Sequence, residues 1–323
     1  MHRREFITYT GAALTLPAAA QSVSAWPSHP LKIVVGFPPG QSSDIATRIV
    51  AEELSHVLGQ PVLVENRPGA GATLAHELVA KAPADGYTLL IGVPGALTMA
   101  PSLYPKLNYD PARDFEPVGM TGFTPYVFVV HPDFPAKTLA DVITMGKAFE
   151  GATLNYGSSG NGSSTHLLME RFKMMTGTKY THVPYKGSVQ ALTDLLGGRL
   201  QVMIDSLTAT APYVKSGKLR ALGISTAKPQ PEMPGVPTIA STIPGYEVVG
   251  TGWLLVPSAT PKPIIDKLVK AIEQVHANPK TSEKLLAQGV FARNDPPEVI
   301  KRNLKDETAS WAKVIQASGA KLN

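Results

Sequence analysis

Residues 34–48 read VVGFPPGQSSDIATR, and this stretch predicts a strand, a tight turn and a helix in immediate succession. The apolar run ends at Pro38-Pro39-Gly40, two serines follow, and apolar residues then recur at helical spacing from Asp44 to Leu58. The first backbone N–H groups of such a helix have no partner within it, so the turn favours an anion. Serine and aspartate are also ordinary helix caps, and this loop alone does not distinguish ligand binding from capping.

The same order of strand, loop and helix occurs again within the first hundred residues. A second strand leads into the glycine-rich loop 66–72, and a helix is predicted from Thr73 to Ala82. This loop matches neither the dinucleotide fingerprint nor a P-loop, so a nucleotide ligand is not expected. Open α/β sheets bind ligands at the carboxyl ends of their strands, where both loops would lie. The predicted strands are 31–37, 61–65 and 87–93.

The pattern recurs in the second half of the chain. A strand at 153–157 is followed by the small polar loop GSSGNGSS at 157–164, which opens a helix through Phe172. The next strand, 179–183, leads into Pro184-Tyr185-Lys186-Gly187, which offers an aromatic face, a phenol and a cation. Asp205 ends a further apolar strand, where it either caps the following residues or receives a donor from a ligand. The remaining predicted elements are a helix at 189–196 and strands at 201–205 and 221–226.

Two extended apolar segments indicate that the chain crosses between two domains. The first is 117–131, interrupted by Gly122 and Pro125, and the second is 248–256. Two crossings imply a discontinuous first domain, residues 26–123 and 248–323, and a second domain, residues 124–247, joined by a hinge. We predict helices at 263–278 and 297–317 and place both on the first domain. The fold class is therefore α/β, with a largely parallel sheet in each domain.

The N-terminal residues 1–25 predict an export signal. A positive start containing Arg3 and Arg4 precedes an apolar, alanine-rich run, and Val23-Ser24-Ala25 offers small residues for cleavage. The Arg-Arg-x-Phe pattern partly fits the twin-arginine type of signal. No later stretch has the ~18 uninterrupted apolar residues that would span a bilayer, so we expect a mature protein that is not embedded in the membrane.

Composition excludes several classes of function. The 323-residue chain has no cysteine, which excludes disulfides and thiol chemistry. Its pI is about 9.2, but the 30 Lys and Arg residues are scattered, so we expect no nucleic-acid partner. The eight histidines form no metal-binding pair at a recognised spacing, and we expect neither a metal nor a cofactor.

An exported hydrolase or transferase that uses Ser163 or Ser164 is the alternative to a binding protein. Such an enzyme needs a nucleophile, a base and an orienting acid, and His166 and His182 are candidate bases. The G-x-S-x-G nucleophile motif is absent around these serines, and His166 falls inside the predicted helix. A base within hydrogen-bond reach of either serine would favour the enzyme.

Six segments in register resemble one family over essentially the whole mature chain. They are FPPGQSSD at 37–44, ENRPGAG at 65–71, ADGYTLL at 84–90, YGSSGNGS at 156–163, HVPYKG at 182–187 and GKLRAL at 217–222. The sequence resembles the substrate-binding receptors of tripartite tricarboxylate transporters, the Bug-type periplasmic proteins. The resemblance implies a two-domain type II periplasmic-binding-protein fold, the Venus flytrap, with a hinge of crossing strands.

The resemblance also implies a function and partners. Receptors of this family are periplasmic, and they deliver small organic acids, mostly carboxylates, to membrane permease subunits of the transporter. A third possibility, a sensor subunit that reports its ligand to a membrane kinase, would share the fold and the binding chemistry.

The ligand-binding residues follow from the same resemblance. In the first domain they are Pro39, Gly40, Ser42, Asp44, Ala72 and Thr73; in the second they are Ser158, Gly160, Ser163, Tyr185, Lys186 and Asp205. Two positions depart from the family pattern, since Gln41 stands where a second glycine is common and Thr73 where asparagine is common. A carboxylate beside an anion site repels the ligand, so Asp44 is expected to fix the loop, orient water or meet an ammonium group.

Overall fold

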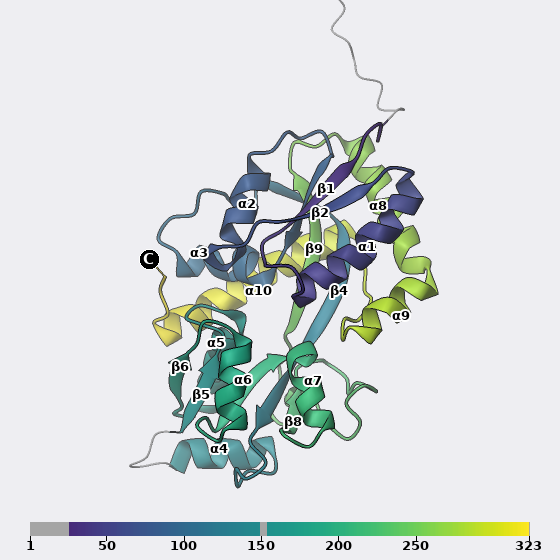
Figure 1. Cartoon of the computed structure of the whole chain (residues 1–323). Coiled ribbons are helices and arrows are strands. Elements are labelled where there is room, and N and C mark those ends of the chain that lie inside the picture. Colours follow the sequence, from purple (N-terminus) through teal and green to yellow (C-terminus); the bar gives the residue numbers. More distant parts are fainter. Residues whose placement is uncertain (1–25, 149–153, 323) are drawn as a thin grey trace, which may run out of the picture.

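The computed structural model describes residues 26–148 and 154–322. The predicted export signal lies outside these residues. Within them, nine strands form one mixed sheet in the order β2-β1-β3-β9-β4-β7-β5-β6, with β8 paired to β4. Figure 1 shows two lobes, one above the other, with β4 and β9 running between them. We call the lobe that contains β1 lobe I and the lobe that contains β5 lobe II.

Lobe I has a parallel core of three strands covered by helices. β1 (Leu31–Val35) pairs in parallel with β2 (Val62–Asn66) and with β3 (Thr88–Gly92), so their carboxyl ends lie at one edge. In α8 the buried residues recur at helical spacing, from Ile264 and Leu268 to Ile272 and Val275, which gives the helix one apolar face for the sheet. The helices are α1 (Ser42–Leu58), α2 (Thr73–Ala80), α3 (Ala100–Leu103), α8 (Lys262–Ala277) and α9 (Pro279–Ala287), with short turns of helix at Ala70–Ala72 and Gly95–Met99.

Lobe II repeats this arrangement. β5 (Asn155–Ser158) pairs in parallel with β6 (Thr181–Pro184) and with β7 (Val202–Ser206), while β8 (Arg220–Ile224) lies antiparallel on β4. Its helices are α4 (Leu139–Ala148), α5 (Ser164–Thr176), α6 (Ser188–Leu196) and α7 (Leu207–Lys215), with a short helical turn at Ile239–Ser241.

The two predicted crossing segments are confirmed as strands shared by both lobes. β4 (Phe115–Val130) pairs with β9 (Val249–Pro257) in lobe I and then with β7 and β8 in lobe II. The pairing register between β4 and β9 shifts between Met120 and Gly122, and the φ of Gly122 is +124°. A side chain at Gly122 would lie 2.5 Å from the carbonyl oxygen of Phe291, so this crossing requires a glycine.

The last helix, α10 (Pro297–Ser318), corrects one prediction. We placed it on the first domain, but it packs against both lobes. Ile300 belongs to an apolar cluster of lobe I, whereas Trp311 and Ile315 belong to the cluster built around Tyr156 in lobe II. Buried residues lie towards both ends of the 22-residue helix, which is long enough to reach from one lobe to the other. The domain boundaries stay a prediction, with residues 26–123 and 248–323 in the first domain and residues 124–247 in the second.

Candidate functional site

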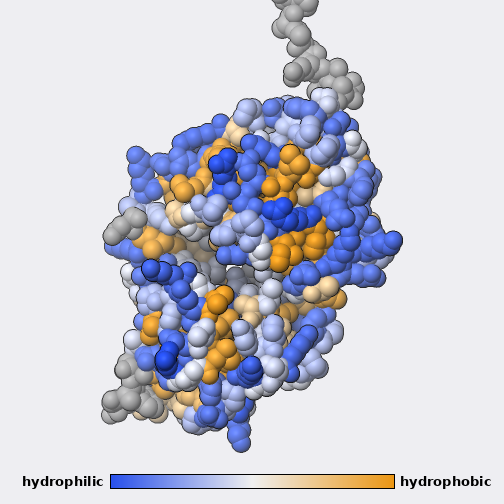
Figure 2. Space-filling model, in the orientation of Figure 1, coloured by the Kyte–Doolittle hydropathy of each residue, from blue (hydrophilic) through white to orange (hydrophobic). Residues whose placement is uncertain are grey.

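The predicted ligand-binding residues all lie at the carboxyl ends of parallel strands. In lobe I they follow β1 and β2. In lobe II Ser158 and Asp205 lie at the ends of β5 and β7, and the others follow β5 and β6. This is the edge at which α/β sheets bind ligands. Figure 2 shows the surface hollowed between the two lobes.

The turn between β1 and α1 is held by Asp44. Gly40 has φ +84°, and its N–H donates a hydrogen bond to Oδ2 of Asp44 at 2.8 Å. The same carboxylate accepts from Nε of Arg48 at 3.1 Å and from Nδ2 of Asn66 at 2.8 Å. Asp44 therefore fixes the loop, one of the three roles expected for it, and the N–H of Gly40 is already paired.

The charge on Asp44 is maintained by the same contacts. The side chain is buried, which by itself would raise the pKa of the carboxyl group. The hydrogen bonds from Arg48, Gly40 and Asn66, with the charge of Arg48, outweigh burial and hold the pKa of Asp44 below its usual value. The loop is thus tied by an ionised carboxylate at neutral pH.

Donors for an anion remain at the start of α1. The first bond of this helix runs from the N–H of Ile45 to the carbonyl of Gln41 at 2.9 Å. Among the residues that the structure describes, none accepts a hydrogen bond from the N–H groups of Ser42, Ser43 or Asp44. Three N–H groups at the positive end of a 17-residue helix favour an anion. Pro39 and Gly40 are exposed beside them.

The loop before α2 has an unusual backbone. Ala70 and Ala72 have φ values of +46° and +78°, and they are the non-glycine residues with positive φ in the described part of the chain. Such conformations cost about 1 kcal/mol or more and cluster at binding sites. Ala72 is buried against Gly36, and the hydroxyl of Thr73 donates to the carbonyl of Ala70 at 2.9 Å. Thr73 thus stabilises the loop, and its hydroxyl has a partner.

In lobe II the loop 158–163, which we call the glycine loop, is held by hydrogen bonds of its own side chains and of His182. Ser158 is fully buried, and its Oγ lies 2.6 Å from Nε2 of His182. The N–H of Gly160 donates to this Oγ at 3.1 Å. Ser163 is the N-cap of α5, accepting from the N–H of His166. The structure brings Ser158, Gly160 and Ser163 together, but Ser158 lies behind the surface of the loop.

The side chain of Tyr185 is held by a hydrogen bond, whereas the side chain of Lys186 is exposed. The phenol of Tyr185 donates to Oδ2 of Asp194 at 2.7 Å, and burial together with this carboxylate raises the pKa of Tyr185 to about 12. Asp194 in turn pairs with Arg199. Lys186 is exposed, and no acidic side chain in the described ranges forms an ion pair with its ammonium group. Lys186 is therefore a cation available beside the loop.

Asp205 is buried near the end of β7, next to Ser206, which is the N-cap of α7. Its Oδ1 accepts from the N–H of Ser206 at 2.7 Å, and its Oδ2 has no partner within the described residues. Burial raises the pKa of Asp205 despite contacts with Ser188 and Ser206. A raised pKa widens the pH range in which a carboxyl group carries a proton and can donate a hydrogen bond.

The geometry around the serines does not assemble a catalytic triad at the predicted positions. The hydroxyl of Ser163 donates to the carbonyl of Gly160 at 2.7 Å. No histidine ring in the described ranges lies within hydrogen-bond distance of the side chains of Ser163 or Ser164. Ser158 does meet His182, but this serine has no exposed surface from which to attack a substrate.

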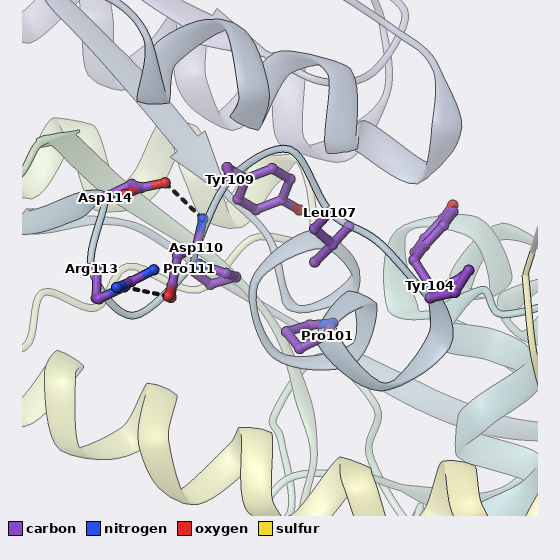
Figure 3. A pocket seen from close by; sticks show the side chains of 9 residues that line it. Pro101, Tyr104, Leu107, Tyr109, Asp110, Pro111, Arg113 and Asp114 are labelled. Atoms are coloured by element: carbon purple, nitrogen blue, oxygen red, sulfur yellow. Dashed lines mark hydrogen bonds and ion pairs between the residues drawn. The ribbon is translucent and has the colours of Figure 1, made fainter.

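A cavity of about 550 Å³ lies elsewhere on lobe I, in the segment that follows α3 (Figure 3). Asp110 there receives a hydrogen bond from Arg113 at 2.5 Å, and Asp114 accepts from the N–H of Asp110. Its polar groups are thus paired, and its two carboxylates disfavour an acidic ligand. None of the predicted ligand-binding residues lines it.

Some residues near the site were not predicted. The turn after β3 brings Gly95 close to the carbonyl of Gly71, and the phenol of Tyr104 donates to the carbonyl of Ala70 at 3.3 Å. His166 and His182 were considered only as catalytic bases. Their rings stack on each other and so connect α5 to β6. The spacing of residues along the sequence does not reveal such a contact.

The described residues lack two features that other kinds of site would need. None of their helices combines the length and apolar character needed to cross a membrane. No group of three or more histidine and acidic side chains among them is arranged to hold a metal ion.

Comparison with known proteins identifies relatives along nearly the whole chain. Residues 46–320 match the family described as tripartite tricarboxylate transporter family receptor. BugT of Bordetella pertussis is 37% identical over 309 residues, which cover 94% of this chain and 94% of BugT.

Solved structures show the same fold. R. palustris Rpa4515 with adipate has a TM-score of 0.81 and 36% identity, covering 92% of this chain and 100% of its own. MatC (Rpa3494) from Rhodopseudomonas palustris with bound malate has a TM-score of 0.77 and 30% identity, covering 90% and 100%. These likenesses confirm the two-domain Venus flytrap fold.

Proposed function

The chain belongs to the tripartite tricarboxylate transporter receptor family, and we propose that it is a periplasmic receptor for a small organic acid. The acid is captured between the lobes and passed, chemically unchanged, to the permease subunits of a membrane transporter. The ligand residues of this proposal are those predicted from the sequence. Asp44 and Ser158 shape their loops from behind, and the N–H groups of Ser42 and Ser43 are the donors at the start of α1.

The observation that carries the proposal is the set of unpaired N–H groups at the start of α1. Neutral, preoriented donors bind a carboxylate without the cost of removing water from a paired cation. Lys186, in the loop between β6 and α6 of lobe II, adds one positive charge for a second acidic end. Oδ2 of Asp205, which has no partner within the described residues, is a further polar group for the ligand. Adipate and malate, bound to two relatives, are acids of this kind.

Closure of the two lobes is the proposed mechanism of capture. β4, β9 and α10 connect the lobes, and a ligand that contacts both lobes stabilises the closed arrangement by its extra contacts there. The permease would then recognise the closed receptor.

A thermal-shift screen of organic acids tests the proposal. A ligand that binds only the folded protein at 100 times its Kd stabilises it by about 2.7 kcal/mol. We expect adipate, malate or a related acid to raise Tm, while the corresponding amides do not. A panel of mono-, di- and tricarboxylates that leaves Tm unchanged would contradict the proposal.

The same sample distinguishes a receptor from an enzyme. The stabilising acid is incubated with the protein for a day and recovered after denaturation, and its proton NMR spectrum is recorded. The receptor returns the acid unchanged, whereas a hydrolase or transferase returns a product.

A further inference from the structure

The glycine loop of lobe II depends on side chains for its shape. Gly160 and Gly162 have φ values of +131° and +70°, so the chain turns twice in conformations that few residues favour. Among the described residues its internal backbone bond runs from the N–H of Ser163 to the carbonyl of Gly160, at 3.2 Å. The N–H groups of Gly160 and Gly162 both donate to side chains instead.

Those two side chains are held by a pair of histidines. The N–H of Gly160 donates to Oγ of Ser158, which in turn lies 2.6 Å from Nε2 of His182. The N–H of Gly162 donates directly to Nδ1 of His166 at 3.1 Å. Nδ1 of His166 can accept this bond only while it carries no proton. One histidine thus holds the start of the loop, and the other holds its end.

The two imidazoles also form one packed unit. Their ring centroids are 3.9 Å apart with planes 8° from parallel, and the ring of Tyr156 stacks against His182. The phenol of Tyr156 donates to Oε1 of Glu170 at 2.5 Å, and Glu170 pairs with Lys173 at 2.7 Å. Two rings at this separation cannot both carry a positive charge without strong repulsion.

We infer that His166 and His182, stacked and neutral, are positioning residues that hold the glycine loop 158–163 in its ligand-binding shape. We call them the histidine pair. The part of this inference that concerns the ligand rests on the proposed function. The part that concerns the loop can be measured without any ligand.

The surroundings of the histidine pair favour the neutral form. Burial lowers the pKa of His182 to about 4, and the neighbouring His166 adds to this effect. Burial also lowers the pKa of His166. The charged side chains that act on the pair are Glu170, which favours protonation, and Lys173, which opposes it. Both lie on α5 and are paired with each other, so their effects partly cancel.

Amide hydrogen exchange of the ligand-free protein, followed by NMR, tests the inference directly. His166→Phe keeps a flat ring in the stack but offers no acceptor to Gly162, and we expect exchange of the Gly162 amide to rise by about tenfold. His166→Asn retains an acceptor close to the position of Nδ1 and should restore most of the protection. In the same way His182→Phe should expose the Gly160 amide, and His182→Gln should partly restore it.

Two controls separate loosening of the loop from unfolding of the lobe. The amide of Gly177, at the other end of α5, donates to the carbonyl of Lys173 at 2.8 Å and should keep its protection in every variant. His56→Phe removes an exposed histidine on α1 and should change neither glycine. Unchanged protection of Gly160 and Gly162 in the phenylalanine variants would overturn the inference.

The pH dependence gives a second readout on the unmutated chain. After correction for the pH dependence of chemical exchange, protection of Gly160 and Gly162 should fall as the pH drops from about 6.5 towards 4. Protection of Gly177 should not follow. The double variant His166→Asn, His182→Gln has no imidazole to titrate and should show a flat profile. A flat profile in the unmutated protein would contradict a neutral pair.

Titration with adipate tests the consequence for binding. If the unmutated protein binds adipate, His166→Phe should weaken that binding by about fivefold to tenfold, and His166→Asn should recover it. Equal affinity in the two proteins would overturn the ligand part of the inference. If the unmutated protein does not bind adipate, the same comparison is made with the acid that raises Tm in the thermal-shift screen. A screen in which no acid raises Tm counts against the proposed function, and the exchange data then decide the role of the pair alone.

Discussion

At the scale of single residues, Asp44 shows how a side chain can serve a ligand site without contacting the ligand. Its carboxylate ties Gly40, Arg48 and Asn66 together and thereby leaves the next N–H groups of α1 open. The sequence indicated this role as one of three, because a carboxylate beside an anion site is otherwise repulsive. Ser158 was harder to assign, since its burial and its bond to His182 depend on a contact between β5 and β6.

Ser42 allows a backbone donor to be removed by mutation. It is the first residue of α1, and Gln41 before it is extended, with φ −82° and ψ 160°. Proline is favoured at the first helical position and suits an extended preceding residue, so Ser42→Pro should fold normally. The variant lacks one N–H donor to the acid, and we expect affinity to fall by about tenfold or more.

Ser42→Ala is the matched control for this prediction, because it removes the hydroxyl and keeps the N–H. Calorimetric titration of both variants with the acid found in the thermal-shift screen separates the two groups. If Ser42→Pro bound the acid as tightly as Ser42→Ala, the backbone donor would have no part in binding.

At the scale of elements, the strands and most helices could be predicted from the periodicity of apolar residues. The helices α3, α4, α7 and α9 were missed. α7 contains Pro212 and starts directly after β7, so its residues resemble a loop. α9 begins at Pro279 and is separated from α8 by Asn278 alone, whereas the prediction ended at residue 278 with no helix after it. Proline at the first position of a helix is common and was the available signal.

α10 was predicted close to its true bounds, but its position between the lobes was not. That position depends on which cluster each part of its apolar face meets, which periodicity does not record. The helix carries Glu307, a half-buried acid. Burial raises the pKa of Glu307 to about 7, although Arg171 and Arg293 pull it down.

Glu307→Gln should therefore stabilise the protein at alkaline pH. The folded-state pKa is above the usual value of 4.5, so the native state binds the proton more tightly than the unfolded state. The stability that this proton gives is lost as the pH rises through about 7. We expect Glu307→Gln to raise Tm by about 2 °C or more at pH 8 and to have little effect at pH 5.

Thermal unfolding of the two proteins at both pH values checks this prediction. Glu298→Gln, on the exposed first turn of the same helix, is the control for removing a surface charge. A gain in Tm at pH 5 as large as that at pH 8 would show that titration of Glu307 is not the cause.

At the scale of the whole molecule, the two lobes are alike in design and are linked at several places. Each presents strand-to-helix loops at the carboxyl edge of a parallel sheet. The described end of the chain adds a further link between the lobes. The N–H of Leu322 donates to the carbonyl of Leu103 in lobe I, and the side chain of Leu322 lies beside Gly162 in lobe II, where a Cβ on that glycine would point. The two-lobed architecture could be predicted from the two crossing segments. The contacts of the C-terminal residues could not, because they join distant parts of the chain.

An amide NMR titration with the acid that stabilises the protein tests the central claim most directly, since it observes both lobes at once. We predict that the signals of Ser42 and Ser43 in lobe I and of Gly160–Ser164 in lobe II shift together, with one common Kd. Shifts confined to one lobe, or centred on the cavity around Asp110 and Asp114, would contradict an acid held between the two.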